Sequence, residues 1–217
     1  MATAVQLQDA YIDYVLTHNE QPKSVYAFAK NIGVTEQEFY DFYSSFTAIE
    51  KDVWYMLTVK AIEQVQQQEI WATYTSREKI LSFFYAYIEL LKTQRSFIVY
   101  SLRRSRTHLS TPEVLDNVKN VFQTFAENVI QTGLESGELA DRRYLSKRYK
   151  NALWIQFGII INFWISDSSK NFEKTDEAIE RGVNVTFDLF QRSPLDDIFE
   201  YGKFVIRNGR FKEKMRF

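Results

Sequence analysis

Apolar residues recur every three or four positions along most of the chain, a spacing typical of helices that bury one face. A first stripe lies between residues 7 and 15, and a second begins near Ser24. The second stripe stops at Gly33, which is placed as a glycine at a helix C-terminus is. Thr35 with Glu38 three residues later is the pattern of a capping box, which starts a third helix. The pattern therefore predicts three short helices before residue 47.

Longer helices are expected beyond this point. Thr47 with Glu50 repeats the capping-box pattern and predicts a fourth helix through Val65, and Thr75 with Glu78 predicts a fifth. The remaining stripes predict four more helices, over about 96–107, from Thr111-Pro112 onward, over about 142–166 and over about 172–191. Gly133 and Gly137 bracket an expected loop. A further helix is expected in the tail from Leu195.

The composition agrees with an all-α fold. Only 7 Gly and 3 Pro occur in 217 residues, whereas folds rich in strands use both residues heavily in their turns. We expect an N-terminal three-helix helix-turn-helix domain over residues 1–47 and a larger helical bundle domain over residues 48–217.

The residues that carry most enzyme chemistry are scarce or badly spaced. There is no cysteine, and neither His18 nor His108 lies at helical spacing from a second histidine and a carboxylate. No glycine spacing forms a phosphate-binding loop, and the Ser-x-x-Lys at residues 76–79 is interpreted as a helix start. We therefore expect no enzyme activity, no metal and no cofactor.

The chain is expected to be cytoplasmic. Residues 1–20 lack a basic segment followed by an apolar one, and they contain Asp9 and Asp13 instead. The longest apolar run, around residues 159–164, is too short to span a bilayer. No membrane insertion is expected.

The segment from Ser24 to Tyr43 resembles the helix-turn-helix of TetR-like transcriptional regulators. In that family an apolar residue, Gly, Val and Ser or Thr are followed by an apolar residue, tyrosine and an aromatic pair. The matching residues here are Ile32, Gly33, Val34, Thr35, Phe39, Tyr40, Phe42 and Tyr43. The motif resemblance covers about residues 5–57, and the rest of the chain is similar in length and helix content.

The resemblance implies a ligand-responsive regulator, of the repressor type, that binds operator DNA as a homodimer. The third helix would enter the major groove. By position, Thr35 and Tyr40 would contact phosphates, Gln37 would read a base edge, and Lys30 would add a phosphate contact. Glu38 is the capping-box partner of Thr35, and its carboxylate can also accept from a cytosine.

The net charge of the N-terminal segment leaves a second function open. Residues 1–60 contain four lysines and eight acids, a net charge of −4, and Glu36 and Asp41 lie on the same third helix as Glu38. DNA affinity comes largely from cations that displace counterions. The alternative is a helical small-molecule-binding or interaction protein of the same fold that has lost DNA binding.

The body is rich in aromatic residues, which normally form core but can also line an apolar cavity. Following the helices that surround the pocket in the family, we expect a small hydrophobic effector to contact Phe84, Ile88, Tyr100, Phe122, Trp154 and Phe157. The last two long helices are apolar on more than one face, as helices with a second partner are. The expected dimer interface comprises Gly158, Ile161, Ile179, Val183 and Phe187.

Basic residues gather in three places. Two clusters comprise Arg103, Arg104, Arg106 and His108, and Arg142, Arg143, Lys147, Arg148 and Lys150. Such clusters are usually solvated or paired with acids, and the alternative is contact with an anionic ligand or phosphate. The tail over 203–217 carries six basic residues and one acid. It could contact nucleic acid or an anionic surface, or pair with the acidic N-terminal segment.

Overall fold

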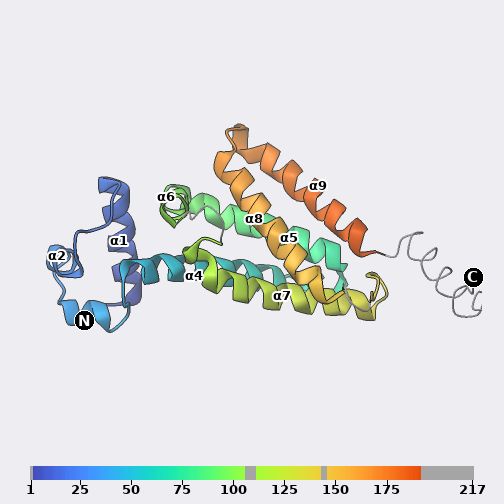
Figure 1. Ribbon diagram of the computed structural model, residues 1–217, viewed down its shortest axis with the longest axis horizontal. Coiled ribbons are helices and arrows are strands. Elements are labelled where there is room, and N and C mark those ends of the chain that lie inside the picture. The colour runs from blue at the N-terminus through green and yellow to red at the C-terminus, as the bar shows by residue number, and fades with distance from the viewer. Residues whose placement is uncertain (1, 106–110, 143–145, 192–217) are drawn as a thin grey trace, which may run out of the picture.

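The structure, a computed structural model, describes residues 2–105, 111–142 and 146–191. Within these ranges the chain is helical and contains no strand, which confirms the all-α prediction. Figure 1 shows a small group of N-terminal helices at one end of an elongated helical body. The α-helices are α1 (Ala4–His18), α2 (Val25–Asn31), α3 (Glu36–Tyr40), α4 (Phe46–Gln66), α5 (Ser76–Thr93), α6 (Arg95–Ser105), α7 (Asp116–Glu135), α8 (Tyr149–Ser166) and α9 (Glu173–Phe190). Short 3-10 helices occupy η1 (Glu69–Thr73), η2 (Glu113–Leu115), η3 (Ser146–Arg148) and η4 (Lys170–Phe172).

Helices α1 to α3 are called the head below. Helix α1 contains the predicted stripe over 7–15, and the start and end of α2 and the start of α3 lie where the sequence predicts. Ser24 caps α2, and its side chain accepts from the backbone N–H of Ala27. Gly33 follows α2 with φ +74°, a conformation that a residue with a Cβ rarely adopts. Thr35 then caps α3, with both bonds of the capping box to Glu38 present. A sharp corner therefore separates α2 from α3.

An aromatic cluster holds the three head helices together. Phe39 of α3 and Phe28 of α2 are fully buried, and their ring centroids are 6.1 Å apart. Both rings also pack on Phe46 at the start of α4, at 5.5 and 5.4 Å. Tyr11 of α1 stacks on the other side of Phe46 at 5.2 Å. Such edge-on and offset contacts add to the area that the rings bury, so they fix the orientation of α3.

Helix α4 links the head to the rest of the chain, called the body below. Ser45, and not Thr47, is its N-cap, because the Ser45 side chain accepts from the backbone N–H of Ala48. Glu50 is therefore not a capping-box partner, and the sequence prediction was wrong here. Because α4 begins at Phe46, the expected boundary between residues 47 and 48 falls in its first turn.

The body packs its helices around α4, which lies against α5 and α7 (Figure 1). The capping box of Thr75 and Glu78 starts α5, as predicted. The expected loop between Gly133 and Gly137 is only partly present, because Gly133 lies inside α7. A Cβ there would come within 2.5 Å of the Ser76 hydroxyl oxygen, so close helix packing explains this glycine. Gly137, at φ +76°, makes the turn.

Helices α8 and α9 lie side by side along one face of the body (Figure 1). Helix α8 begins at Tyr149, later than the predicted start near residue 142. The helix expected from Leu195 and the basic tail over 203–217 lie outside the described residues. Among the helices that the structure describes, none is long and apolar enough to cross a membrane.

Candidate functional site

Helix α3 presents a polar face at the end of the molecule. Gln37 is exposed, and the Tyr40 side chain is 54% exposed, whereas Phe39 between them is fully buried. Lys30, at the end of α2, is also exposed, and its ammonium lies 5.9 Å from the ring centroid of Tyr26. The turn at Gly33 thus brings Lys30, Gln37 and Tyr40 to the surface of one small unit.

Thr35 and Glu38 are engaged with each other. The Glu38 carboxylate accepts from the backbone N–H of Thr35 at 2.9 Å and from its hydroxyl at 3.1 Å. These hydrogen bonds lower the pKa of Glu38 below its ordinary value, since they stabilise the charged form. Glu38 therefore has a structural role as the cap of α3.

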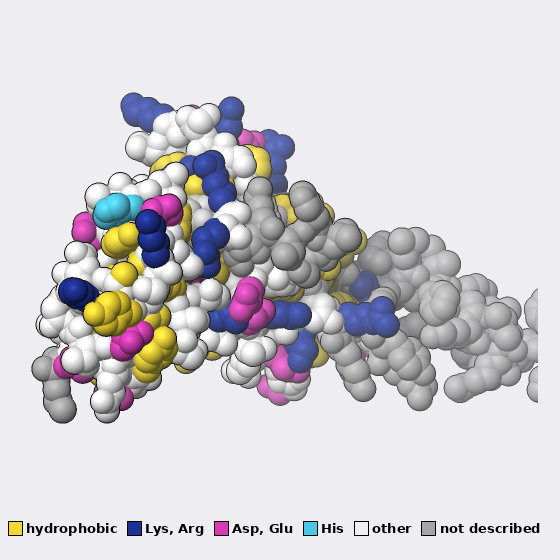
Figure 2. All heavy atoms as spheres, turned by 60° about the vertical axis from the view of Figure 1, so that its left-hand side comes forward, with side chains coloured by type: hydrophobic (Ala, Val, Ile, Leu, Met, Phe, Trp, Pro, Cys, Tyr) yellow, Lys and Arg dark blue, Asp and Glu magenta, His cyan; other side chains and the backbone are white. Residues whose placement is uncertain are grey.

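The charge on this surface is mixed. Glu36 and Asp41 are exposed at the two ends of α3, so they flank Gln37. Figure 2 shows acidic, basic and apolar side chains interleaved over the head, without a continuous basic surface on the face in view. Phe42 is 46% exposed and adds an apolar side chain beside α3.

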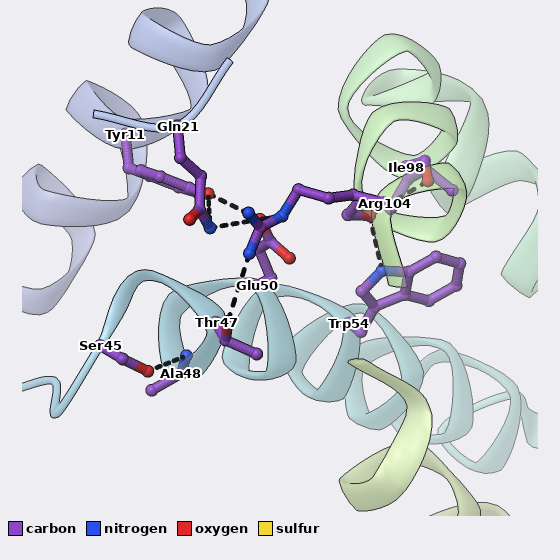
Figure 3. Close-up of polar contacts among 10 residues, drawn as sticks. Tyr11, Gln21, Ser45, Thr47, Ala48, Glu50, Trp54, Ile98 and Arg104 are labelled. Carbon is purple, nitrogen blue, oxygen red and sulfur yellow. Dashed lines mark hydrogen bonds and ion pairs between the residues drawn. The ribbon is translucent and has the colours of Figure 1, made fainter. Parts of the chain in front are cut away.

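The junction between head and body is built around a buried acid, Glu50 of α4, which is only 1% exposed. Its carboxylate accepts from the Tyr11 hydroxyl at 2.6 Å and from the Gln21 amide at 3.3 Å. Arg104 of α6 reaches it from the opposite side, with Nε at 3.6 Å (Figure 3). We call Tyr11, Gln21, Glu50 and Arg104 the junction cluster, and it joins α1, the following loop, α4 and α6.

A second contact lies next to the junction cluster. The Trp54 indole N–H donates to the Ser101 hydroxyl at 3.0 Å, and that hydroxyl donates to the Ile98 carbonyl (Figure 3). Both side chains are buried. Helix α6 therefore contacts α4 at two successive points. Because Glu50 also binds Tyr11 and Gln21, a shift of α6 would displace contacts that hold the head.

Burial raises the pKa of Glu50, while the hydrogen bond from Tyr11 and the charge of Arg104 lower it. Because the folded value exceeds the unfolded one, the ionised carboxylate destabilises the fold. This penalty is absent below the unfolded pKa and fully present above the folded pKa. Loss of the Arg104 charge would raise the folded pKa further.

We predict that Arg104→Gln lowers the free energy of unfolding by about 1–2 kcal/mol at neutral pH, since the Arg104 side chain is partly exposed. The loss should shrink as the pH falls and Glu50 becomes protonated. Thermal or urea unfolding at a series of pH values measures it. The double variant Arg104→Gln/Glu50→Gln should show no such pH dependence relative to Glu50→Gln alone.

Arg181→Gln is the matched control, because Arg181 is 79% exposed and, among the described residues, forms an ion pair with Glu177 one turn away on the same helix. It should change stability by less than about 0.5 kcal/mol. An equal loss for Arg104→Gln at every pH would contradict the assignment of Glu50 as its partner.

The residues expected to line an effector pocket fall into three groups. Phe84, Ile88, Phe122 and Phe157 are buried in the body core, where the rings of Phe122 and Phe157 are 5.0 Å apart. Trp154 is partly exposed and stacks on Phe157 at 4.9 Å. Tyr100 lies on α6, away from the other five, beside the head. The four core side chains thus fill space that a ligand would need.

An apolar groove lies next to this core. It has a volume of about 310 Å³ and runs between α6, η2 and α8. Trp154 lies in its wall, together with Leu102, Pro112, Leu115 and Gly158. A Cβ built on Gly158 meets no atom within 4 Å, so the glycine leaves this space open. The volume and lining are those of a site for a small apolar molecule.

The residues expected at a dimer interface mostly face inward. Ile161 is 2% exposed, and Ile179, Val183 and Phe187 are fully buried, so these four side chains pack within the protomer. The same two helices carry a different exposed apolar set, which we call the outer stripes. They comprise Ile155, Ile159 and Phe163 on α8 and Val185 and Leu189 on α9, exposed by 65, 57, 41, 60 and 66%.

Sequence reasoning missed the junction cluster and the outer stripes, although both leave a signal. Glu50 lies four residues after Phe46 and four before Trp54, on the apolar face of α4, and a charge in that register indicates a buried acid. The outer stripe of α8 repeats every four residues beside the inward one.

Some members of the basic clusters have partners among the described residues. Lys150 bridges to Glu127 at 2.9 Å, and the Arg142 guanidinium donates to the backbone carbonyls of Leu189 and Gln191. Arg106, His108 and Arg143 lie outside the described residues. Within the described part of the chain, no group of three His, Asp or Glu side chains is placed to hold a metal ion.

Comparison with known proteins agrees with this arrangement. Residues 79–205, more than half of the chain, match a family model described as tetracyclin repressor-like, C-terminal domain. A crystal structure of a protein assigned to the TetR family of transcription regulators from Shewanella sp. PV-4 has the same fold, with a TM-score of 0.59 at 11% identity, over 88% of this chain and 100% of that one. No protein of curated function matches the sequence. The chain belongs to the tetracyclin repressor-like (TetR) family of transcription regulators.

Proposed function

We propose that the protein is a ligand-responsive repressor that binds operator DNA as a homodimer. The observation that carries this proposal is the exposed face of α3, with Gln37 and Tyr40 held outward over the buried ring of Phe39. A short helix that follows a sharp turn and rests on a rigid base is the form that enters a major groove. A DNA-binding regulator acts in the compartment that holds the DNA, so the proposal includes a cytoplasmic location.

Four residues at this end of the molecule have roles in the proposed complex. The Gln37 amide can pair with an adenine edge, and the Tyr40 hydroxyl and the Lys30 ammonium can contact phosphates. Thr35 contributes through the start of α3, since its hydroxyl is already engaged by Glu38. Because acidic and basic side chains are interleaved on the face of the head that Figure 2 shows, sequence-specific contacts would supply a large share of the affinity.

Glu36 and Asp41 oppose DNA, and their removal should strengthen binding. We predict that Glu36→Gln/Asp41→Asn raises affinity for a duplex from the region flanking the protein's own gene about 3- to 10-fold at low salt. The gain should fall as salt is added, because salt screens the repulsion. Fluorescence anisotropy of the labelled duplex measures both quantities.

A pair of exposed acids at the far end of the body provides the control. Glu63 and Glu69 lie near the end of α4 and in η1, and Glu63→Gln/Glu69→Gln removes the same charge far from α3. Equal gains for both double variants would mean that α3 does not face the DNA.

The alternative function, an interaction protein that has lost DNA binding, also has support in the structure. Tyr26, Tyr40 and Phe42 are 59, 54 and 46% exposed, close to the two exposed acids of α3. Exposed aromatic residues are enriched at protein interfaces. If no duplex binds at low salt, this alternative replaces DNA binding.

The apolar groove beside Gly158 is the proposed effector site. We predict that Gly158→Leu fills the groove and abolishes the fluorescence gain of a neutral apolar dye, Nile red, on mixing with the protein. Gly158→Ala adds one methyl group in open space and should retain most of the gain. Dye binding that is unaffected by Gly158→Leu would place the apolar site elsewhere.

The outer stripes are the proposed homodimer interface. Two adjacent helices that expose apolar side chains at helical spacing can pair with the same two helices of a second copy. Pairing would cover five side chains that are each at least 41% exposed in one protomer. The dimer would then hold two α3 helices on one operator.

A further inference from the structure

A large cleft separates the head from the body, far from the apolar groove. Its volume is about 870 Å³. The end of α1 and the following loop, from Val15 to Gln21, form one wall, and α6 forms the other. Neither the DNA-reading surface nor the proposed effector groove uses this space.

Helix α6 gives this cleft its positive charge. Arg95, Arg103 and Arg104 line it, and Glu20 is the acid among the lining residues. The Arg95 guanidinium is engaged by the backbone carbonyls of Trp164 and Ile165, both at 3.1 Å. Arg104 is shared with Glu50 at 3.6 Å. Arg103 is exposed and forms no ion pair with a described residue, so its charge is available to a ligand.

A buried hydroxyl is a second indication that this cleft binds a ligand with an acceptor oxygen. Tyr100 lines the cleft, and its hydroxyl is buried without a hydrogen-bond partner among the described residues. Burial raises the pKa of Tyr100. Buried hydroxyls nearly always have a partner, so this one lacks an acceptor that a ligand oxygen could supply.

Apolar side chains provide the rest of the lining. Leu16, on the head wall, is 45% exposed although it is apolar. Val99 on α6 and Ile165 at the end of α8 also line the cleft. A ligand that suits both halves of the lining has an anionic group and an apolar part.

We propose that this cleft binds a small amphipathic carboxylate. The carboxylate accepts hydrogen bonds from Arg103 and Tyr100 and lies near the charge of Arg104, and the apolar part covers Leu16 and Val99. Binding of the carboxylate here does not require that the protein binds DNA. Because one wall belongs to the head and the other to the body, an occupied cleft also fixes their relative position.

Calorimetric titration of the full chain with octanoate tests the proposal, with octanol and octylammonium as matched probes. Octanoate should bind, octanol should bind at least about tenfold more weakly, and octylammonium should not bind. Arg103→Gln should weaken octanoate binding about 10- to 100-fold, and Tyr100→Phe about 3- to 10-fold.

Two controls separate this cleft from other sites. Arg181→Gln removes an exposed arginine from α9 and should leave octanoate binding unchanged. Gly158→Leu should also leave it unchanged, since Gly158 lies in the other groove. Thermal unfolding confirms that each variant is folded. Absent octanoate binding, binding that Arg103→Gln does not alter, or binding that Gly158→Leu abolishes would each overturn the proposal.

Discussion

Leu189→Glu is expected to convert the proposed homodimer into a monomer. Leu189 is 66% exposed in one protomer and lies on the outer stripe of α9, where the proposed interface would bury it. Two-fold symmetry introduces the charge twice, and each buried carboxylate costs on the order of 2 kcal/mol. The dimer dissociation constant should therefore rise about 1,000-fold or more, which light scattering after size exclusion detects.

Val5→Glu is the matched control for this substitution. Val5 is 63% exposed on α1 of the head, so the same charge is added at similar exposure away from the outer stripes. It should leave the dimer intact. A Leu189→Glu protein that remains dimeric would mean that copies associate through another surface or that Leu189 lies outside the interface.

Phe39→Ala is expected to unfold the head and abolish DNA binding while the dimer persists. Phe39 is fully buried between Phe28 and Phe46, and removal of a buried phenyl ring typically destabilises by about 3–5 kcal/mol. Loss of far-ultraviolet helix signal with an unchanged molar mass measures this effect. The outer stripes lie on the body, so the proposed dimer interface should be unaffected.

Phe42→Ala tests whether the effect depends on burial. Phe42 follows α3 closely and is 46% exposed, so its removal should change stability by less than about 0.5 kcal/mol. A fully folded Phe39→Ala protein that still binds DNA would contradict the role assigned to the aromatic cluster.

Local signals in the sequence were sufficient for the head and for most helix boundaries. Gly33 and the Thr35–Glu38 capping box act through the backbone within a few residues, so their pattern alone predicts the corner before α3. The same reasoning failed at Thr47 and Glu50, where the pattern was present but Ser45 competes for the cap and Glu50 is drawn into the junction cluster.

Tertiary packing determines two features that the sequence pattern leaves open, the place of Gly133 and the buried stripe of α8. Gly133 looks like a loop residue, yet it lies within α7, where Ser76 and Leu139 leave no room for a side chain. Helix α8 has two apolar stripes, and the sequence does not say which one the protomer buries. The choice depends on α7 and α9, which pack on the side of Ile161 and leave Ile159 exposed.

The candidate ligand sites also depend on packing that the sequence pattern does not reveal. Phe84, Phe122 and Phe157 were expected around a cavity because of the helices that carry them, but they contact one another in the core. The two candidate ligand sites lie instead beside Gly158 and beside Tyr100. Residue type alone cannot distinguish an aromatic side chain that fills a core from one that lines a cavity.

Selection from a pool of random-sequence duplexes tests DNA reading by α3 most directly. The wild-type chain, at low salt, should enrich an inverted repeat whose half-sites lie about one helical turn, or a multiple of it, apart. Gln37→Ala should keep the spacing and relax the preference at one position in each half-site. No enrichment by the folded, dimeric wild-type protein would contradict a DNA-binding regulator and favour the interaction protein of the same fold.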